Sequence, residues 1–352
     1  MDKNKFTQCI LTLTRNCNLR CEFCSAQKGG YNSNDFMPFD GLKKIIELCN
    51  DAKVKYIVLS GGEPLLYPEL INLLNFIKAM PHKMIPTIAT NGILLADYDF
   101  CKRIIDCGIS YVDLSLKGKD KNEWLAVTKR DGSIQQAKAI RNLSALNVDF
   151  TCSMVLTPHN VGTFCETLEN AYDSGARNFS FTFVIDNIDS EEKDLEYLIS
   201  HNPLALVDKF ISQIDETDRV TKGEWWIEYS FPLCIYTDDQ LKKLDRRLAE
   251  PCYIRNRDIV TFEFDTKMNL LPCSMFIDKK TVGKFGADFS SFSELESYVN
   301  GKSYNDIMDT FKELPANDCL SCEHKDSCMG GCPWFWAHCS FEAFKEFKRR
   351  NG

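Results

Sequence analysis

The sequence lacks the features that mark exported, membrane-spanning and nucleic-acid-binding proteins. No segment reaches the roughly 18 consecutive apolar residues that a bilayer-spanning helix needs, and the N-terminal segment has no apolar stretch of the signal-peptide type. The 42 basic and 50 acidic residues give a formal net charge of -8, and no basic run would follow a phosphate backbone. We therefore expect a cytoplasmic, soluble protein that binds neither nucleic acid nor a membrane.

Internal repeats and low-complexity tracts are also missing, so the chain is read as ordinary globular sequence. Its 352 residues, 44% of them hydrophobic, can bury one large core and a smaller second one. We expect a first domain over 1–190, a charged connector over 191–233 and a second domain over 234–352.

The first half alternates short apolar runs with amphipathic stretches, which is typical of βα units around a parallel sheet. Six such units predict an α/β fold, a partial (βα)6 TIM-like barrel whose chemistry lies in the loops after the strands. Asp40 and Ser133 are expected to cap two of the helices. The predicted strands are Cys9–Leu13, Tyr56–Leu59, Thr87–Thr90, Tyr111–Leu116, Phe150–Leu156 and Asn178–Val184.

The second half changes character after about Asp186. We expect a helix over 204–214, the aromatic stretch EWWIEYSFPLC, and short strands at Val260–Phe264 and Leu270–Leu271. A region with so few long apolar elements makes a poor core unless metal ties it together. The second domain is therefore predicted to be a small, cysteine-rich α+β domain.

The abundance of cysteine is the strongest signal. The chain has 17 cysteines, and a disulfide framework is improbable in a reducing compartment, so metal binding is the leading account. Three cysteines form a Cx3Cx2C cluster at Cys17, Cys21 and Cys24, directly after the first predicted strand. Three thiolates can hold three irons of a 4Fe-4S cubane and leave the fourth iron open, whereas a structural zinc ion requires four closed ligands.

This cluster resembles the signature of the radical S-adenosylmethionine (SAM) superfamily, Cx3CxφC, with Phe23 as the aromatic residue. A second motif follows the second strand, where VLSGGEPLL is similar to the family's GGEP motif, whose backbone binds the amino group of SAM. A glycine pair lets the backbone approach a ligand closely, although such a segment could also be an ordinary turn. The motif residues are Gly61, Gly62, Glu63 and Pro64.

Weaker correspondences place further residues near the cofactor. Thr90 and Asn91 follow the third strand and Ser115 ends the fourth, where relatives contact the methionyl and ribose parts. Many relatives carry SxDG at that last place, whereas this chain reads SLKG. Lys117 is therefore expected either to pair with the SAM carboxylate or to lie in solvent, and Arg130 is a second such cation.

The C-terminal cysteines resemble the SPASM extension of some radical SAM enzymes, in which two auxiliary 4Fe-4S clusters have interleaved ligands. The resemblance assigns Cys319, Cys322, Cys328 and Cys339 to one cluster, and Cys252, Cys273 and Cys332 to the other. Cys234 is a candidate for the missing fourth ligand of the second set, the alternative being an open iron. Zinc competes here too, because CxxC pairs are common in zinc ribbons.

Two further expectations concern Met268 and the cysteines outside the two clusters. Met268 stands where relatives have a glycine, so the turn at that position is expected to differ. The scattered cysteines have no matching role, and we expect them to be buried as small hydrophobic residues. They are Cys9, Cys49, Cys101, Cys107, Cys152 and Cys165.

The resemblance implies an iron-sulfur enzyme that reductively cleaves SAM to a 5'-deoxyadenosyl radical and oxidises its substrate, with three 4Fe-4S clusters in all. SPASM relatives commonly modify peptides or proteins, so the expected partners are such a substrate, for example a ribosomally made peptide that receives a thioether or carbon-carbon crosslink. A separate leader-binding protein and an electron donor such as flavodoxin or ferredoxin are further expected partners. The alternatives are a radical SAM dehydrogenase or coupling enzyme for a small metabolite, and a zinc-stabilised binding protein.

Overall fold

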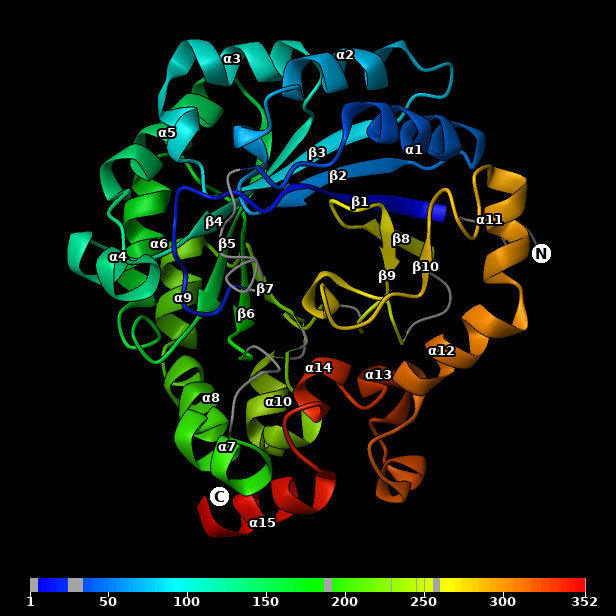
Figure 1. Cartoon of the computed structure of the whole chain (residues 1–352). Helices are drawn as coiled ribbons and strands as arrows, with labels where there is room; N and C mark the ends of the chain where they lie inside the picture. Colours follow the sequence, from blue (N-terminus) through cyan, green and yellow to red (C-terminus); the bar gives the residue numbers. More distant parts are fainter. Residues whose placement is uncertain are drawn as a thin grey trace.

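The computed structural model describes residues 6–24, 34–186, 192–228, 230–244, 246–249, 251–255 and 260–351. Helices surround a curved sheet on its outer side, and the cysteine-rich C-terminal segment lies across the open side of the sheet (Figure 1). Within these residues no helix is long and apolar enough to cross a membrane. The predicted domain boundary at 190–191 lies outside the described residues.

Within the described residues, one ten-stranded sheet runs through both halves of the chain, in the order β10-β9-β8-β1-β2-β3-β4-β5-β6-β7. The strands from β8 to β7 in this order pair in parallel, and β9 and β10 add an antiparallel edge. Because β7 and β10 form opposite ends of this order, the barrel is incomplete. The strands are β1 Phe6–Thr14, β2 Tyr56–Gly61, β3 Ile85–Thr90, β4 Tyr111–Leu116, β5 Asp149–Leu156, β6 Phe179–Phe183, β7 Trp225–Ile227, β8 Val260–Phe264, β9 Asn269–Leu271 and β10 Gly283–Lys284.

The helices follow the strands as the alternating pattern predicts. In the first half they are α1 Phe39–Asp51, α2 Leu70–Ala79, α3 Tyr98–Asp106, α4 Lys121–Thr128, α5 Ser133–Ala145, α6 Phe164–Asp173, α7 Asp194–His201, α8 Pro203–Ile211 and α9 Ile214–Thr221. In the second they are α10 Asp238–Leu244, α11 Phe292–Val299, α12 Lys302–Lys312, α13 Lys325–Cys328, α14 Pro333–Trp336 and α15 Phe341–Asn351. Short 3-10 turns are η2 Pro64–Leu66, η3 Ile93–Ala96, η4 Leu233–Ile235, η5 Ser274–Phe276 and η6 Asn317–Ser321.

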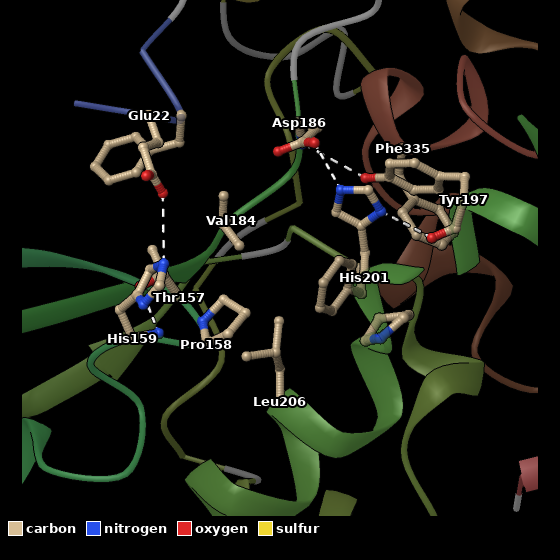
Figure 2. Close-up of a pocket in the computed structure, with 13 residues that line it drawn as sticks. Glu22, Thr157, Pro158, His159, Val184, Asp186, Tyr197, His201, Leu206 and Phe335 are labelled. Atoms are coloured by element: carbon tan, nitrogen blue, oxygen red, sulfur yellow. Dashed lines mark hydrogen bonds and ion pairs between the residues drawn. The ribbon is translucent and has the colours of Figure 1, made fainter. Parts of the chain in front are cut away.

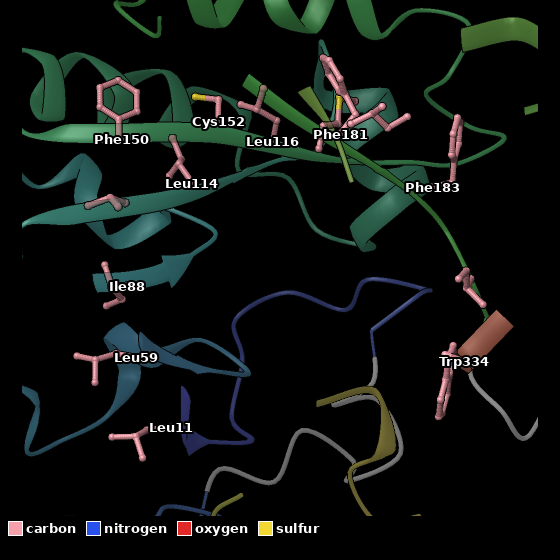
Figure 3. Packing of buried hydrophobic residues seen from close by; sticks show 14 of the residues in the cluster. Leu11, Leu59, Ile88, Leu114, Leu116, Phe150, Cys152, Phe181, Phe183 and Trp334 are labelled. Carbon is pink, nitrogen blue, oxygen red and sulfur yellow. The ribbon is translucent and has the colours of Figure 1, made fainter. Parts of the chain in front are cut away.

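The core is formed by one face of the sheet. Leu11, Leu59 and Ile88 stand in register on β1, β2 and β3, and all three are fully buried (Figure 3). Alternate positions on a strand point to opposite faces, so the residues between them face the interior of the barrel. On β4 this interior row includes Asp113, which makes the barrel lumen polar.

The fold prediction is confirmed. All six predicted barrel strands are present, and β8 has the predicted bounds, but β8 joins the barrel sheet beside β1 instead of forming a separate one. The stacked rings of Phe6 and Phe262, with centroids 4.6 Å apart, hold these two strands together. Long-range pairing of this kind leaves no signal in local sequence, which is why it was missed.

Both predicted helix caps are wrong. Asp40 lies inside the first turn of α1, where its carboxylate pairs with Lys43 at 2.7 Å, and Pro38 takes the cap position. Ser133 is the first residue of α5, and the carboxylate of Asp131 accepts from its backbone N–H at 3.0 Å. Both helices therefore begin one or more residues earlier than an oxygen-bearing cap would require.

Most of the scattered cysteines are buried as predicted. Cys9, Cys49, Cys101, Cys152 and Cys165 lie in the core, whereas Cys107 is only half-buried at the end of α3. None of the seventeen cysteines, all of which are described, forms a disulfide.

Candidate functional site

The Cx3Cx2C loop leaves the carboxyl end of β1 and turns over the barrel. Cys17 and Cys21 are buried and Cys24 is half-buried, and the Cys24 backbone N–H donates to the Cys21 carbonyl at 3.2 Å. Burial, together with the charges of Glu63, Cys24 and Cys21, raises the pKa of the Cys17 thiol to about 12. The three thiols therefore lie within electrostatic range of one another.

This donor set fits an iron-sulfur cluster better than a single ion. Among the described residues no group of three or more His, Cys, Asp or Glu side chains is arranged to hold one metal ion. One zinc ion would draw its thiolates to within about 4 Å of each other, since each Zn–S bond is about 2.3 Å. A cubane takes one thiolate per iron, so three cysteines can hold it and leave the fourth iron open.

Buried apolar side chains pack against the cysteine loop. Cys17, Leu19 and Cys21 form a buried cluster with Trp124 of α4, whose side chain is fully buried. Backbone bonds fasten the loop to the same helix, including one from the Arg20 N–H to the Thr128 carbonyl at 2.9 Å. These contacts with α4 support the part of the loop that carries Cys17 and Cys21.

The glycine pair of GGEP packs closely against the chain just before the cysteine loop, and its role in cofactor binding stays a prediction. A Cβ on Gly61 would lie 2.3 Å from the Thr14 carbonyl oxygen, and one on Gly62 would lie 2.3 Å from that of Asn16. The Gly62 and Glu63 N–H groups donate to these same two carbonyls at 2.7 and 2.8 Å. The missing side chains let β2 approach the chain just before Cys17.

Glu63 accepts hydrogen bonds from several segments of the site. Its carboxylate, 1% exposed, accepts from the Thr90 hydroxyl at 2.6 Å and from the backbone N–H groups of Asn91 and Leu65 at 2.9 and 3.1 Å. Burial raises the pKa of Glu63, and these donors together with Lys117 oppose that shift. Glu63 therefore joins the ends of β2 and β3, while Pro64 begins the η2 turn beside it.

Asn91 extends this network to the cysteine loop. Its amide donates to the Asn18 side-chain oxygen at 2.7 Å, and Arg130 donates to the Asn18 backbone carbonyl at 2.9 Å. The Asn91 and Ser115 carbonyls both accept from Gln136 of α5, at 3.3 and 2.7 Å. The predicted contact residues therefore gather around the loop and fix its position.

Lys117 does not lie in solvent, so that alternative is wrong. Its side chain is 6% exposed, and its ammonium lies 5.6 Å from the ring centroid of Phe23 in the cysteine loop. Burial raises the pKa of Asp113 as well as that of Glu63, and the positive charge of Lys117 partly offsets both shifts. A buried ammonium between two carboxyl groups is available to a carboxylate ligand at this edge of the barrel.

Sequence reasoning named no acid or base, but the structure places one in the lumen. Glu228 follows β7, and its N–H donates to the Phe181 carbonyl at 2.8 Å. Its side chain is solvent-exposed, but desolvation by the surrounding protein, with the charge of Asp113, raises its pKa to about 7. The charge of Glu228 also raises the pKa of the Cys252 thiol. Glu228 therefore lies between β4 and the second cysteine region. A lone glutamate after a three-residue strand has no distinguishing sequence pattern.

The second cysteine region gathers in two places. Burial raises the pKa of the Cys273 thiol, and Cys252 and Cys332 add to the shift. Glu263 lies beside Cys273 as well, and its carboxylate accepts from the Tyr253 hydroxyl at 3.0 Å. Cys252 and Cys332 therefore lie within electrostatic range of Cys273.

The other place holds Cys319, Cys322 and Cys328, together with Cys234. Burial raises the pKa of the Cys319 thiol, and the charges of Cys328 and Cys322 add to this shift. Burial likewise raises the pKa of the Cys234 thiol, with added contributions from Cys328 and Cys319. Cys339 instead lies between α14 and α15. The ligand assignments themselves stay predictions.

The turn at Met268 keeps the geometry that a glycine would give. Met268 has a φ of +61°, which is the left-handed region, and the Asp265 side chain accepts from the N–H groups of Lys267 and Asn269 at 2.9 and 2.8 Å. These side-chain bonds stabilise the unfavourable φ, and whether the turn differs from that of relatives stays a prediction.

A cavity of about 320 Å³ joins the first cysteine loop to the C-terminal region (Figure 2). Glu22 and Phe23 form one side, the loops after β5 and β6 the floor, and Phe335 of α14 the far side. The described residues that line it include no lysine or arginine. They are Glu22, Phe23, Thr157, Pro158, His159, Val184, Asp186, Tyr197, His201, Pro203, Leu206, Phe231 and Phe335.

Asp186 organises the rim of this cavity. Its carboxylate is 2.6 Å from His201 Nε2, as the view of the cavity shows (Figure 2). The Asp186 carbonyl accepts from Trp334 Nε1 at 2.7 Å. The hydrogen bond to His201 lowers the pKa of Asp186, and the same bond raises the pKa of His201. Tyr197 stacks on His201 with ring centroids 4.3 Å apart.

The close approach of β2 to β1 predicts a site-specific cost for Gly61→Ala. Gly61 has a φ of +132° and no room for a Cβ, whereas Gly108 has a φ of +125° and open space around it. Gly108→Ala therefore measures backbone strain alone, about 1 to 3 kcal/mol. We expect Gly61→Ala to lower the free energy of urea unfolding by clearly more than Gly108→Ala, and equal losses would contradict the packing role.

The Asp186 and His201 pair predicts a pH-dependent stability. Its contribution needs ionised Asp186, so it falls as pH drops through the Asp range near 3.8, and it needs protonated His201, so it fades as pH rises through the elevated pKa above 6.5. His201→Gln should therefore cost up to about 1 kcal/mol near pH 6 and little near pH 9. Urea unfolding of both proteins at the two pH values measures this, and a loss independent of pH would refute it.

Comparison with known proteins gives the chain its family. The profile of the radical SAM superfamily matches residues 11–195, which is just over half of the chain. The GTP 3',8-cyclase of Petrotoga mobilis is 28% identical over 162 residues, 46% of this chain and 49% of that protein. The GTP 3',8-cyclase of Chlorobaculum tepidum is 32% identical over 135 residues, 38% of this chain and 40% of that protein. The chain thus spans about half the length, or less, of these curated relatives.

Solved structures show the same fold over nearly the whole chain. The structure described as native anSMEcpe with bound AdoMet and Cp18Cys peptide has a TM-score of 0.71 at 16% identity and covers 97% of this chain and 96% of that one. Streptococcus suis SuiB bound to precursor peptide SuiA has a TM-score of 0.63 at 17% identity and covers 94% of this chain and 72% of that one. The likeness includes the cysteine-rich C-terminal region, and the family match replaces the alternative of a zinc-stabilised binding protein. The chain belongs to the radical SAM superfamily and is a radical SAM enzyme.

Proposed function

We propose that this enzyme oxidatively modifies a peptide or protein, with auxiliary iron-sulfur clusters in the 234–352 region. The observation that carries the proposal is the cavity between the Cx3Cx2C loop and α14. One side is formed by Glu22 and Phe23, within the predicted signature, and the opposite side by Phe335, three residues after Cys332. A side chain bound there lies between the place where a radical would form and the place where an electron would be accepted.

Cys17, Cys21 and Cys24 would hold the first cluster, and three thiolates would leave one of its four irons for SAM. A 4Fe-4S cluster bound there supplies the electron that breaks a carbon-sulfur bond of SAM and yields the 5'-deoxyadenosyl radical. Lys117 would bind the SAM carboxylate, and Thr90, Asn91, Ser115 and Arg130 would hold the surrounding loops. Phe23 and Trp124 would exclude water from the reacting atoms.

The lining of the cavity favours an apolar or aromatic peptide side chain. Apart from the pairs Glu22 with His159 and Asp186 with His201, the wall is formed mainly by aromatic, proline and aliphatic groups. Enclosed sites with few polar groups bind such ligands. The likeness to peptide-bound anSMEcpe and SuiB supports the same class of substrate.

A small metabolite is the second candidate, and the cyclase relatives favour it. A nucleoside triphosphate carries several negative charges, however, and the two carboxylates in the cavity would repel them. The described lining residues offer no lysine or arginine to compensate. We therefore rank a metabolite substrate second.

The substrate class is tested with deuterium. Cells of the source organism are grown in deuterated medium, and their extract is separated into a peptide and protein fraction and a small-molecule fraction. Each fraction is incubated anaerobically with reconstituted enzyme, SAM and dithionite, and 5'-deoxyadenosine is analysed by mass spectrometry. Deuterium carried over from the peptide fraction alone is expected, and transfer from the small-molecule fraction alone would reverse the ranking.

The first cluster is tested by Cys21→Ala. Loss of one of three thiolates should abolish cleavage of SAM to 5'-deoxyadenosine, with about four fewer irons per chain. Cys107→Ala, which removes a half-buried cysteine of α3, is the matched control and should keep both. Cleavage that persists in the Cys21→Ala protein would end the radical assignment of this loop.

The cavity is tested by Leu206→Trp, which fills it from α8. We expect the deuterium transfer to be lost while SAM cleavage without substrate continues, because the cysteine loop is untouched. Ile199→Trp on α7, whose side chain is 54% exposed, is the control and should preserve both. Unchanged transfer in Leu206→Trp would show that the substrate binds elsewhere.

A further inference from the structure

Cleavage of SAM, as proposed above, consumes an electron that must reach the Cx3Cx2C loop from outside the chain. This requirement rests on the proposed function. Electron transfer slows steeply with distance, so the donor has to come close to the loop. Since Glu22 and Phe23 of that loop face the substrate cavity, the donor has to approach it from another side.

A groove of about 500 Å³ lies between α4, α5 and α6, on the outer side of the barrel (Figure 1). Trp124 of α4 lines this groove, and the same fully buried side chain belongs to one cluster with Cys17 and Cys21. Gly132 permits this packing, because a Cβ on it would lie 2.6 Å from Cζ3 of the Trp124 ring. One side chain thus connects the groove with the buried cluster of the cysteine loop.

Exposed apolar side chains stand beside this groove. Ile134 of α5 lines it and is 66% exposed. Leu125 of α4 is 39% exposed and lies one turn after Lys121, which also lines the groove. These are two of the five exposed large hydrophobic side chains among the described residues. Single exposed apolar residues are ordinary, but two beside one groove favour a surface that contacts another protein.

The charges around the groove favour an acidic partner. Lys121 and Arg141 line it, and Lys138 lies one turn before Arg141 on the same face of α5. These three cations form no ion pair with a described carboxylate. Of the two acids among the described lining residues, Asp120 accepts two backbone N–H groups as the cap of α4, so only Asp173 opposes the cations. In a chain with a net charge of -8, such a surface is where an acidic protein is attracted.

We propose that the groove between α4, α5 and α6 is the docking site of a small, acidic electron-transfer protein that reduces the first cluster. Carboxylates of this partner would pair with Lys121, Lys138 and Arg141, and its apolar contact residues would cover Ile134. One electron leaves the reduced partner, which is thereby oxidised, and passes to the first cluster, with Trp124 filling the space between them. No proton or chemical group moves in this step.

Charge reversal tests the docking site. Lys121→Glu, Lys138→Glu and Arg141→Glu are combined in one variant, and SAM cleavage is driven either by dithionite or by an acidic flavodoxin that NADPH and a reductase keep reduced. Dithionite is a small ion that needs no docking surface, so cleavage driven by it should not change. With flavodoxin we expect about a tenfold loss at low ionic strength, because three attractive charges become repulsive.

The matched control reverses three exposed lysines on other helices. Lys102→Glu, Lys242→Glu and Lys302→Glu, on α3, α10 and α12, lower the net charge of the chain by the same amount. This variant should keep both activities. Flavodoxin-driven cleavage that is equal in the two triple variants overturns the proposal.

Cross-linking provides a readout that does not depend on catalysis. A carbodiimide joins carboxylates to the lysine amines that touch them, and mass spectrometry of the digested wild-type complex with flavodoxin should find the joins at Lys121 and Lys138, and lose them at high salt. Joins confined to other lysines overturn the proposal. A dimer of the chain in gel filtration that only the groove variant loses also overturns it, because a second copy would then occupy the groove. A wild-type chain that fails to cleave SAM with dithionite contradicts the proposed function instead.

Discussion

The rest of the site depends on the hydrogen bonds that the buried carboxylate of Glu63 accepts. This carboxylate is buried at the ends of β2 and β3, where three donors satisfy it. A buried carboxylate without such donors would be strongly destabilising, so these contacts fix the two strand ends relative to each other. Through Asn91 and Asn18 the same network reaches the loop that carries Cys17. The geometry of the first cysteine set is therefore set by a residue that the motif analysis assigned to cofactor binding.

The continuous sheet gives the two cysteine regions a common frame. β8 pairs with β1, and the loop with Cys273 follows from the hairpin that β8 begins. An ion pair adds to this link, because the buried Arg15, two residues before Cys17, contacts the exposed Asp278 beyond η5. Electron transfer between two sites needs a fixed distance, and a shared sheet provides it more firmly than a flexible connection between domains would.

Charge distribution explains how one interior can serve two kinds of ligand. Lys117 lies near the cysteine loop, where an anionic cofactor group would bind, and the carboxyl groups of Asp113 and Glu228 lie further into the lumen. The neighbouring cavity has an apolar wall with two acid and histidine pairs. Glu228, with its pKa near 7, is in the range where a carboxyl group can accept or donate a proton at neutral pH.

The sequence by itself determined the superfamily and the six barrel strands, because these depend on local periodicity and on motif spacing within single loops. Only the tertiary structure decided the partners of Gly61, the burial of Lys117, the place of β8 in the barrel and the contact of Leu233 with Cys328. Each of these depends on contacts between segments far apart in the chain. Spacing along a chain does not measure distance across a fold, and for that reason the position of Glu228 near Asp113 could not be read from it either.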